Sequence, residues 1–194
     1  MTTHHARRER ERAEREQSIV TAARDLAEAD GWDAVTTRRL AAEIEYSQPV
    51  LYSHFKGKSA IMAAVVVQAC GDLADVLHAA RTGARGKRQV LCAVATAYTE
   101  FAERRPAVYD AIFTHPVDLP FATPEAPAQL HAAFGEIVAT VRPLAEGADD
   151  AELVVLTETF WSSLHGLVTL MRSGRLRRED HERRLALLIG RFWS

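Results

Sequence analysis

The sequence predicts an all-α fold. Apolar residues recur three and four positions apart through most of the 194-residue chain, which is the period of a helix that buries one face. No segment alternates apolar and polar residues for long enough to indicate a strand, and no motif repeats at a fixed period. Because 47% of the residues are hydrophobic, the helices can bury a substantial core, and a disordered chain is excluded.

The chain begins with a charged segment that leads into an amphipathic helix. Arginines and glutamates alternate from Arg7 to Glu16, a pattern typical of a solvated helix face. In the alternative, Arg7 and Arg8 form a flexible arm that enters a DNA minor groove. A buried helix face ending at Gly31 is predicted next, from the apolar residues Ile19, Val20, Ala23, Leu26 and Ala27.

Two short helices separated by a break are predicted between Thr36 and Lys58. The first has one apolar face and a threonine at its start, where a hydroxyl can cap the free N–H groups. The face consists of Leu40, Ala41 and Ile44, and the cap is Thr36 or Thr37.

The second short helix begins after the break at residues 45–46. Ser47 is placed to cap it, and Pro49 is tolerated because the first turn of a helix has no partner for that N–H. Leu51 and Phe55 are four apart and turn inward together. Two short helices joined in this way form the pattern of a DNA-reading helix-turn-helix.

The outer side of the second helix has chemistry suited to DNA. Gln48 can make paired hydrogen bonds to adenine, and Pro49 and Val50 can contact thymine methyl groups in the major groove. Phosphate contacts are expected from Tyr52, His54 and Lys58. The alternative is a surface helix pair of an ordinary helical bundle, in which Tyr52 and His54 serve as packing residues.

The order and spacing of these residues resemble a known family. T-T-R-x-L-A at residues 36–41, Q-P-x-L-Y-x-H at residues 48–54 and the following Lys58 are similar to the N-terminal domain of the tetracycline-repressor (TetR) family of transcriptional regulators. The resemblance runs from about Ile19 to Ala64. It implies a DNA-contacting set of Thr37, Arg38, Gln48, Pro49, Val50, Tyr52, His54 and Lys58, with Ser47 as a further member.

The turn between the two helices departs from the family pattern. The family usually has a glycine followed by a small apolar residue there, whereas this chain has Glu45 and Tyr46. A non-glycine residue in a left-handed turn costs roughly 1–2 kcal/mol. Either the turn has a different shape here, or operator affinity is reduced, to which the negative charge of Glu45 contributes.

Charge and composition narrow the function. The net charge of −2 and the pI near 6.4 argue against a nonspecific polybasic nucleic-acid binder, so DNA binding must come from a local patch. Between residues 36 and 58, the positive groups Arg38, Arg39, Lys56 and Lys58 outnumber Glu43 and Glu45. The sequence shows no signal-peptide core, and no stretch is expected to be long and apolar enough to span a membrane, so a cytoplasmic protein is predicted. Cys70 and Cys92 are predicted to be thiols, not a disulfide.

The remainder of the chain is predicted to be helical with one long loop. Helices are expected at about residues 58–81 and 88–103, and a short helix after Pro106. Residues 115–127 contain four prolines and are expected to form a loop. Another helix is expected to about Leu144. Asp149 and Glu152 then resemble a capping box at the start of a long apolar helix that ends at Gly174.

The last predicted helix has Leu185, Leu188, Ile189 and Phe192 on one face, with Leu187 and Trp193 outside it. The surplus of apolar surface on the last two helices, about residues 150–193, predicts a homodimer interface. Trp161, His165 and Gly166, together with A-Y-x-x-F-A-x-x-x-P-A-x-Y at residues 97–109, resemble the C-terminal domain type named for its W-H-G residues. Members of the family typically dimerise through these two helices and sense a small molecule.

The resemblance also implies a ligand cavity in the C-terminal domain. Candidate lining residues are Tyr98, Phe101, Tyr109, Phe113, Phe134, Trp161 and His165, a mostly apolar set with a few polar tips. The alternative is that they form an ordinary core, with the nitrogens of His165 satisfied by backbone or hydroxyl groups.

Other classes of protein find less support. The chain contains neither a G-x-S-x-G motif nor paired E-x-x-H helices, and the glycine that a phosphate-binding loop would need before Gly57-Lys58-Ser59 is Tyr52. His115 and Asp118 alone are weak evidence for a metal site. We therefore predict no enzyme, no cofactor and no metal site. A small-molecule-binding helical protein with weak or lost operator binding remains the alternative.

The predicted organisation has two parts. A helix-turn-helix DNA-binding domain covers residues 1–57, with its motif at about residues 36–55. A ligand-binding and dimerisation domain covers residues 58–194. The predicted partners are double-stranded operator DNA, an unidentified small-molecule effector and a second copy of the chain.

Overall fold

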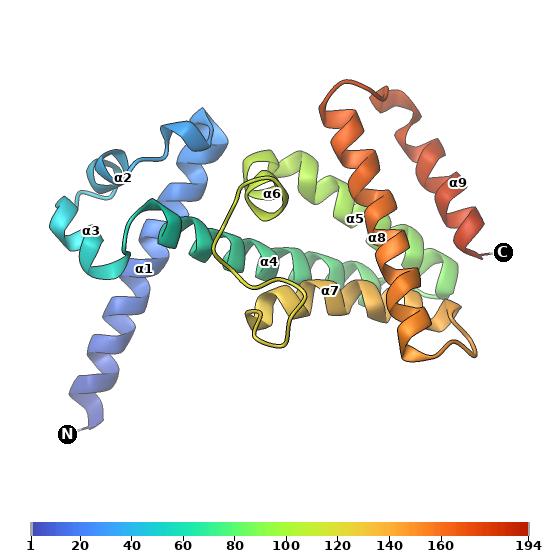
Figure 1. The fold of residues 1–194 in the computed structure, drawn as a ribbon, viewed down its shortest axis with the longest axis horizontal. Coiled ribbons are helices and arrows are strands. Elements are labelled where there is room, and N and C mark those ends of the chain that lie inside the picture. Colours follow the sequence, from blue (N-terminus) through green and yellow to red (C-terminus); the bar gives the residue numbers. More distant parts are fainter. Residues whose placement is uncertain (1, 194) are drawn as a thin grey trace. The chain divides into compact units, whose positions relative to one another are not determined.

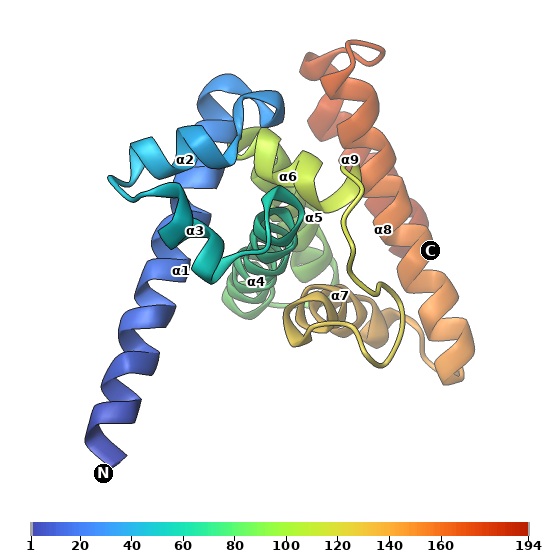
Figure 2. The same cartoon turned by 60° about the vertical axis from the view of Figure 1, so that its left-hand side comes forward.

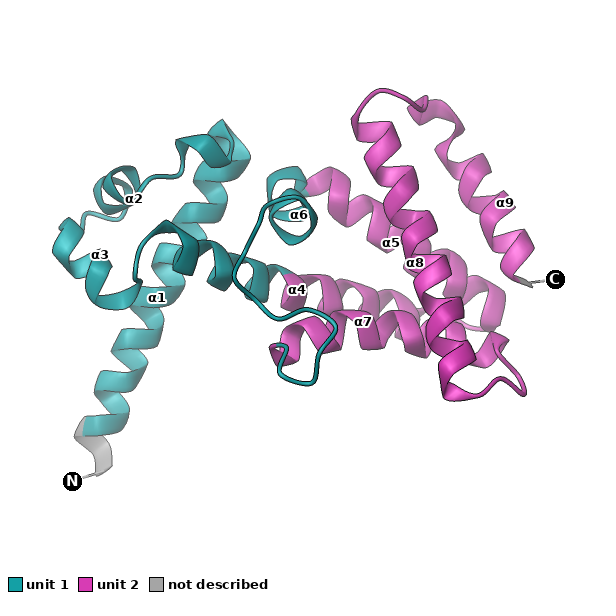
Figure 3. Cartoon of the chain, in the orientation of Figure 1, with its two compact units in different colours: residues 1–69, 105–126 teal, residues 70–104, 127–194 magenta. Residues whose placement is uncertain are grey.

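The computed structural model describes residues 2–193 and is all-α, as predicted; no strand occurs in that range (Figure 1). Side chains are described for residues 5–192. Met1 and Ser194, the outer ends of the two predicted domains, lie outside the described residues. The chain divides into two compact units (Figure 3). Unit 1 contains residues 1–69 and 105–126, and unit 2 contains residues 70–104 and 127–194.

The long helix α4 (Lys58–Gly83) contributes to both units. Its first half, which includes the buried Ile61, Val65 and Val66, belongs to the core of unit 1. The division between the units therefore lies inside one helix and not in a linker. The functional boundary expected at Lys58 stays a prediction.

Unit 1 is built around α1 (Thr2–Asp30), which contacts α2 (Thr37–Glu43), α3 (Gln48–His54) and α6 (Pro106–Phe113). A 3-10 turn, η1 (Trp32–Ala34), follows α1. The predicted apolar stripe of α1 is buried throughout; it consists of Ile19, Val20, Ala23, Leu26 and Ala27. The charged segment before it is helical, so the alternative of a flexible arm at Arg7 and Arg8 is wrong for this structure.

The helix caps of the α2–α3 pair are partly as predicted. Thr36 is the N-cap of α2, and its hydroxyl oxygen accepts the N–H of Arg39 at 3.2 Å. Ser47 occupies the N-cap position of α3, but its side chain makes no capping hydrogen bond. Pro49 lies in the first turn of α3, as expected. The start of α3 is therefore stabilised by the proline in its first turn and not by a hydroxyl cap.

The turn between α2 and α3 keeps the left-handed geometry although it lacks a glycine. Glu45 has φ 56°. The N–H of the next residue, Tyr46, donates to the carbonyl of Ala41 at 2.8 Å, which closes the end of α2. The possibility that the turn has a different shape is therefore not supported, because Glu45 adopts the left-handed conformation. Adopting this conformation with a non-glycine residue carries a conformational cost.

Helix α6 is attached to α1 by hydrogen bonds to its first turn. The Glu28 carboxylate accepts the N–H groups of Ala107 and Val108, both at 3.1 Å. The indole N–H of Trp32 donates to the carbonyl of Ala107 at 2.7 Å. A carboxylate at a helix N-terminus satisfies free N–H groups and complements the helix dipole. These bonds explain why α6 belongs to unit 1.

Unit 2 contains the second half of α4 and four further helices. Helix α5 (Lys87–Arg104) contacts α7 (Ala128–Val141), α8 (Asp150–Arg172) and α9 (His181–Trp193), and α7 also contacts α8. Short 3-10 turns precede the last two helices, η2 (Arg142–Leu144) and η3 (Arg178–Asp180). The predicted cap of α8 is correct, because the Asp149 carboxylate accepts the N–H of Glu152 at 2.9 Å.

Residues 114–127 form the predicted loop without regular helix.

Two helices correct the expectation about membrane spans. By length and composition alone, α4 and α8 are long and apolar enough to cross a membrane. This is weak evidence, since the core helices of soluble proteins pass the same test, and half of the α4 segment is buried inside the protein. Cys70 and Cys92 are free thiols, as predicted, and burial raises the pKa of Cys70 to about 12.

Candidate nucleic-acid interface

Helices α2 and α3 form a two-sided pair. Leu40, Ala41 and Leu51 are buried against the rest of unit 1. On the opposite side, the predicted DNA-contacting residues Arg38, Ser47, Gln48, Pro49, Val50 and Tyr52 are all exposed. The exposed fraction of Val50 is 37% and that of Tyr52 is 51%, although both side chains are largely apolar. A short helix with an exposed apolar and amide face is suited to base edges in a major groove.

Two hydrogen bonds hold this face in place. The hydroxyls of Tyr52 and Thr37 lie 3.3 Å apart and join α3 to α2. The Ser53 hydroxyl donates to the carbonyl of Val50 at 2.6 Å. Thr37, another predicted contact, is half-buried and is used in this link. The outer residues of α2 and α3 therefore form one continuous surface.

Two of the predicted phosphate contacts are engaged within the protein. The side chain of His54 is only 8% exposed, and its Nδ1 lies 3.4 Å from Oε1 of Glu16. The ammonium of Lys58 donates to the carbonyl of Trp32 at 2.7 Å. Lysine has two further N–H donors, so this bond leaves donors for a phosphate. His54 is thus packed within unit 1, whereas Lys58 is exposed and only partly engaged there, and the DNA role of both residues stays a prediction.

The positive patch expected near α2 and α3 is smaller than the sequence indicated. Arg39 pairs with Asp30, which reduces its contribution to the local charge. Arg38 and Lys56 are exposed. The weak patch inferred from the sequence between residues 36 and 58 is thus reduced to Arg38, Lys56 and the partly engaged Lys58.

Positive side chains of α1 lie next to this surface, and among them only Arg8 was considered as a DNA contact on sequence grounds. A surface hollow of about 320 Å³ is lined by Arg8, Glu11, Arg12 and Arg15 of α1 and by Ser53 and His54 of α3. The spacing of four and three residues between the arginines indicates in the sequence that they share one side of a helix. The alternating charges in the sequence did not indicate that one helical side of this segment meets α3.

The aromatic residues predicted to line a ligand cavity are divided between the units. Tyr109 and Phe113 belong to α6 in unit 1, where their ring centroids are 4.6 Å apart. In unit 2, the Trp161 indole N–H donates to the Tyr98 hydroxyl at 3.0 Å, and the rings of Trp161 and Phe134 are 6.0 Å apart. The remaining members of the set, Phe101 and His165, also belong to unit 2.

Three of the seven residues of this aromatic set are buried, and the other four are half-buried. Tyr98, Phe101 and Tyr109 have exposed fractions of 0%, 7% and 2%, respectively. Burial lowers the pKa of His165, whose Nε2 lies 3.4 Å from the hydroxyl of Thr169. These contacts are those of a packed core, and the assignment of the set to a ligand stays a prediction.

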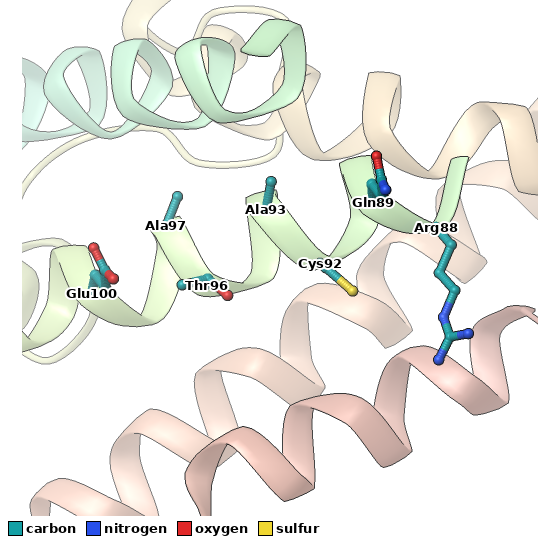
Figure 4. Close-up of a pocket in the computed structure, with 7 residues that line it drawn as sticks. All are labelled: Arg88, Gln89, Cys92, Ala93, Thr96, Ala97 and Glu100. Carbon is teal, nitrogen blue, oxygen red and sulfur yellow. The ribbon is translucent and has the colours of Figure 1, made fainter. Parts of the chain in front are cut away.

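The largest of the surface hollows described lies along α5 and has a volume of about 770 Å³. Figure 4 shows its lining residues on successive turns of this helix, with the Cys92 thiol on one side and the methyl groups of Ala93 and Ala97 on the other. It is wide open to solvent. None of its lining residues belongs to the predicted aromatic set; they are Arg88, Gln89, Cys92, Ala93, Thr96, Ala97 and Glu100.

No group of three or more His, Cys, Asp or Glu side chains within the described part of the chain is arranged to hold a metal ion. His115, considered as a ligand on sequence grounds, instead places its ring 5.9 Å from that of Trp32 in an edge-to-face arrangement.

Comparisons with known proteins fit this architecture. Residues 19–65 match the family model of bacterial regulatory proteins of the tetR family, and residues 91–192 match that of the tetracyclin repressor-like C-terminal domain. An uncharacterised HTH-type transcriptional regulator of Mycobacterium tuberculosis is 28% identical over 158 residues, which are 81% of this chain and 70% of that protein. The class D tetracycline repressor protein of Escherichia coli is 42% identical over 52 residues, 27% of this chain and 24% of the repressor.

Solved structures share the fold. A protein of unknown function from Rhodococcus sp. RHA1 has a TM-score of 0.77 at 22% identity, covering 92% of this chain and 93% of its own. BioQ, solved with its natural double-stranded DNA operator, has a TM-score of 0.64 at 20% identity, covering 92% of this chain and 97% of its own.

Proposed function

Because the chain belongs to the TetR family of bacterial transcriptional regulators, we propose that it binds a near-palindromic operator as a homodimer, acts as a repressor and is released by a small molecule. The family consists of DNA-binding regulators that are not enzymes, and its members bind operator DNA and dimerise. What is specific to this chain is which residues carry each role.

The observation that carries the proposal is the outer face of α3. Gln48, Pro49 and Val50 are exposed in the first turn of this helix, while Leu51 beside them is fully buried. The buried leucine fixes the rotation of the helix, so the amide and the two apolar groups face outward together. In a major groove, Gln48 would pair with adenine, and Pro49 and Val50 would contact thymine methyl groups.

Residues around α3 would position the protein on the DNA backbone. We assign this role to Thr37, Arg38, Ser47, Tyr52, His54 and Lys58. Arg38 and Tyr52 are best placed for it because both are exposed. His54 and Lys58 are the weakest members, since each already contacts a group of unit 1. Backbone contacts set register and orientation and carry no base preference.

The dimer interface is assigned to α8 and α9. Val154, Val155 and Leu170 of α8 and Leu187 of α9 are exposed in the single chain, with fractions between 40% and 63%. Exposed apolar side chains on two neighbouring helices are typical of a subunit interface. The ring contact between Phe160 and Phe192, at 5.1 Å, joins the two helices into one surface. The two copies of α3 would then lie one turn of DNA apart, about 34–36 Å.

An effector would act through the C-terminal unit. We assign its binding to the members of the aromatic set that belong to unit 2, which are Tyr98, Phe101, Phe134, Trp161 and His165. Ligand binding would favour one orientation of α4, which would change the separation of the two reading helices. Linkage makes the effect reciprocal, so saturating operator DNA must weaken effector binding by the same factor. Because the chain has to be near DNA, we also propose that it is cytoplasmic.

Two observations favour a second function. Glu45 places a negative charge next to α3, and Arg39 is paired with Asp30. Both features reduce the attraction of this surface for phosphate groups. They fit a helical protein that binds a small molecule and has weak or lost operator binding.

The test is a binding titration on a selected sequence. Duplexes bound by the purified protein are first selected from a random pool and from DNA beside its own gene. Fluorescence anisotropy then measures the affinity for a selected duplex and for its scrambled version at two salt concentrations. We expect Gln48→Ala to lose about 1–3 kcal/mol of the preference for the selected duplex, a change of roughly fivefold to 150-fold.

The matched control is Gln89→Ala, an exposed glutamine of α5, which should leave the preference unchanged. Arg38→Ala should weaken the binding of both duplexes and flatten the salt dependence, whereas Arg85→Ala, in the loop after α4, should not. If selection enriches no sequence and the wild-type protein binds both duplexes equally, the regulator proposal fails and the second function is favoured.

A further inference from the structure

We propose that one side of α1, formed by Arg8, Arg12 and Arg15, binds the phosphate backbone of DNA beside the segment that α3 reads. We call this surface the α1 arginine face. The inference rests on the proposed function, because it extends the same DNA-binding surface. It assigns a role to a helical segment that lies outside the residues matched by the family model, which begin at residue 19.

The arginines share one side of the helix. Positions 8, 12 and 15 are separated by four and three residues, so their side chains lie above one another on α1. This side of α1 meets the last turn of α3, where Ser53 and His54 complete the surface hollow. Figures 1 and 2 both show α3 beside the middle of α1, and the helix continues beyond α3 toward the N-terminus. The α1 arginine face therefore lies next to the C-terminal end of α3.

Positive charge remains on this face after the ion pairs are counted. Glu11 pairs with Arg7 at 2.8 Å, and Glu16 pairs with Arg12 at 2.8 Å. Arg8 and Arg15 are exposed and form no ion pair among the described residues. The only carboxylate that lines the hollow is that of Glu11, and it is already neutralised by Arg7. The face thus carries an uncompensated charge although the chain as a whole is negative.

A DNA phosphate is the partner that this geometry fits. Guanidinium groups bind phosphate oxygens through two parallel N–H bonds, and they keep their charge at any working pH. If α3 lies in a major groove, the DNA strand that borders the groove passes the end of α3, where the α1 arginine face is located. The helix holds the side chains in register, so less freedom is lost on binding than with a flexible arm. A local field of this kind also attracts DNA despite the net charge of −2.

The test compares two double variants that remove equal charge. Arg8→Gln with Arg15→Gln removes the two arginines of the α1 arginine face that form no ion pair, and glutamine preserves helix propensity. The control is Arg10→Gln with Arg85→Gln. Arg10 lies in the same segment but, two positions from Arg8 and Arg12, on the other side of α1, and Arg85 is an exposed loop residue. Circular dichroism checks that the helix content of both variants equals that of the wild type.

The readout is the affinity for the selected duplex over a series of salt concentrations. Each phosphate contact contributes about 0.9 to the slope of log affinity against log salt, and a dimer carries two copies of each arginine. We therefore expect Arg8→Gln/Arg15→Gln to flatten the slope by roughly 2–4 and to weaken binding about tenfold or more at low salt. The control should change both quantities by much less. The preference for the selected over the scrambled duplex should stay unchanged, since phosphates carry no sequence information.

Each outcome separates the inference from the proposed function. If the selected duplex is preferred but the two double variants behave alike, the α1 arginine face is overturned and the regulator proposal stands. If no duplex is preferred while Arg8→Gln/Arg15→Gln alone flattens the slope, the face binds DNA and the sequence-specific function fails. If the wild-type protein binds no DNA at any salt concentration, both are overturned.

Discussion

The outer face of α3 and the aromatic set of unit 2 differ in what their side chains already do within the protein. Gln48, Pro49 and Val50 are exposed, and no packing requirement accounts for an apolar valine on that face. Tyr98, in contrast, is fully buried and accepts the indole N–H of Trp161. An exposed face of defined chemistry points outward to a partner. A buried aromatic side chain already has a sufficient explanation in the stability of the core.

This difference explains why the two site assignments have unequal support. The proposed DNA contacts rest on an accessible surface and on a motif with strict spacing. The proposed ligand contacts rest on resemblance and on residue type alone, and the hollow along α5 is lined by other residues. This difference between the two regions would not hold if a buried aromatic residue were dispensable for folding, or if an exposed one were essential for it.

The largest expected effect comes from replacing one buried and one exposed aromatic residue with alanine. Phe160→Ala should lower the free energy of unfolding by about 3–5 kcal/mol, because Phe160 is fully buried against Phe192 and its removal leaves a cavity. Tyr52→Ala should change it by about 0.5 kcal/mol or less, since Tyr52 is half exposed. Urea unfolding followed by circular dichroism measures both. The comparison would be wrong if the two variants were destabilised equally.

The same pair separates folding from binding. Tyr52→Ala should weaken operator binding while the fold is retained. Tyr52→Phe keeps the ring and removes the hydroxyl that contacts Thr37, so it distinguishes a role of the ring from a role of that hydrogen bond. Operator binding by Tyr52→Ala at the wild-type level would remove Tyr52 from the interface.

The sequence predicted those parts of the fold that depend on local rules. Helix period, the Thr36 and Asp149 caps and the proline-rich loop are all properties of a few neighbouring residues, and the structure agrees with each. The rotation of α3 was also predictable, because Leu51 and Phe55 are four residues apart and mark one inward side of the helix, and Leu51 is fully buried.

Contacts between distant residues were not predictable in this way. Nothing near His54 in the sequence indicates that it lies beside Glu16, 38 residues earlier, or that the ammonium of Lys58 reaches the carbonyl of Trp32. The pairing of Arg39 with Asp30 and the meeting of Arg8 with α3 depend on how helices pack. Residue type gave the candidate charges, whereas tertiary packing decided which of them stay available.

A smaller effect on stability is expected at the turn between α2 and α3, where one residue has a strained backbone conformation. Glu45 has a left-handed φ of 56°, a conformation that glycine adopts without strain. Glu45→Gly should therefore stabilise the protein by about 1 kcal/mol, which corresponds to an increase in Tm of about 2–4 °C for a chain of this size. Thermal unfolding by calorimetry measures the shift.

Two further variants separate conformation from charge at this position. Glu45→Asn tolerates the left-handed conformation and removes the charge, whereas Glu45→Gln removes the charge alone. We expect all three variants to bind operator DNA more tightly, and only glycine and asparagine to raise the Tm. A lower Tm for Glu45→Gly would show that the side chain stabilises the turn and would contradict the strain account.

The smallest expected effect concerns the ion pairs that hold unit 2 together. Burial opposes the ionisation of Glu136, but hydrogen bonds from Arg81 and His78, at 2.7 and 3.0 Å, outweigh it and hold the pKa of this carboxyl below its ordinary value of 4.5. A carboxyl whose pKa is lowered by folding stabilises the folded state above the unfolded pKa and loses this contribution as the pH falls through the folded pKa. Glu136→Gln should thus cost up to about 1 kcal/mol at pH 7, and the difference in Tm from the wild type should shrink below about pH 4.5. Glu11→Gln, which breaks a more exposed pair in unit 1, should have a smaller effect at every pH, and an equal effect of the two variants would show that partial burial adds nothing to the pair in unit 2.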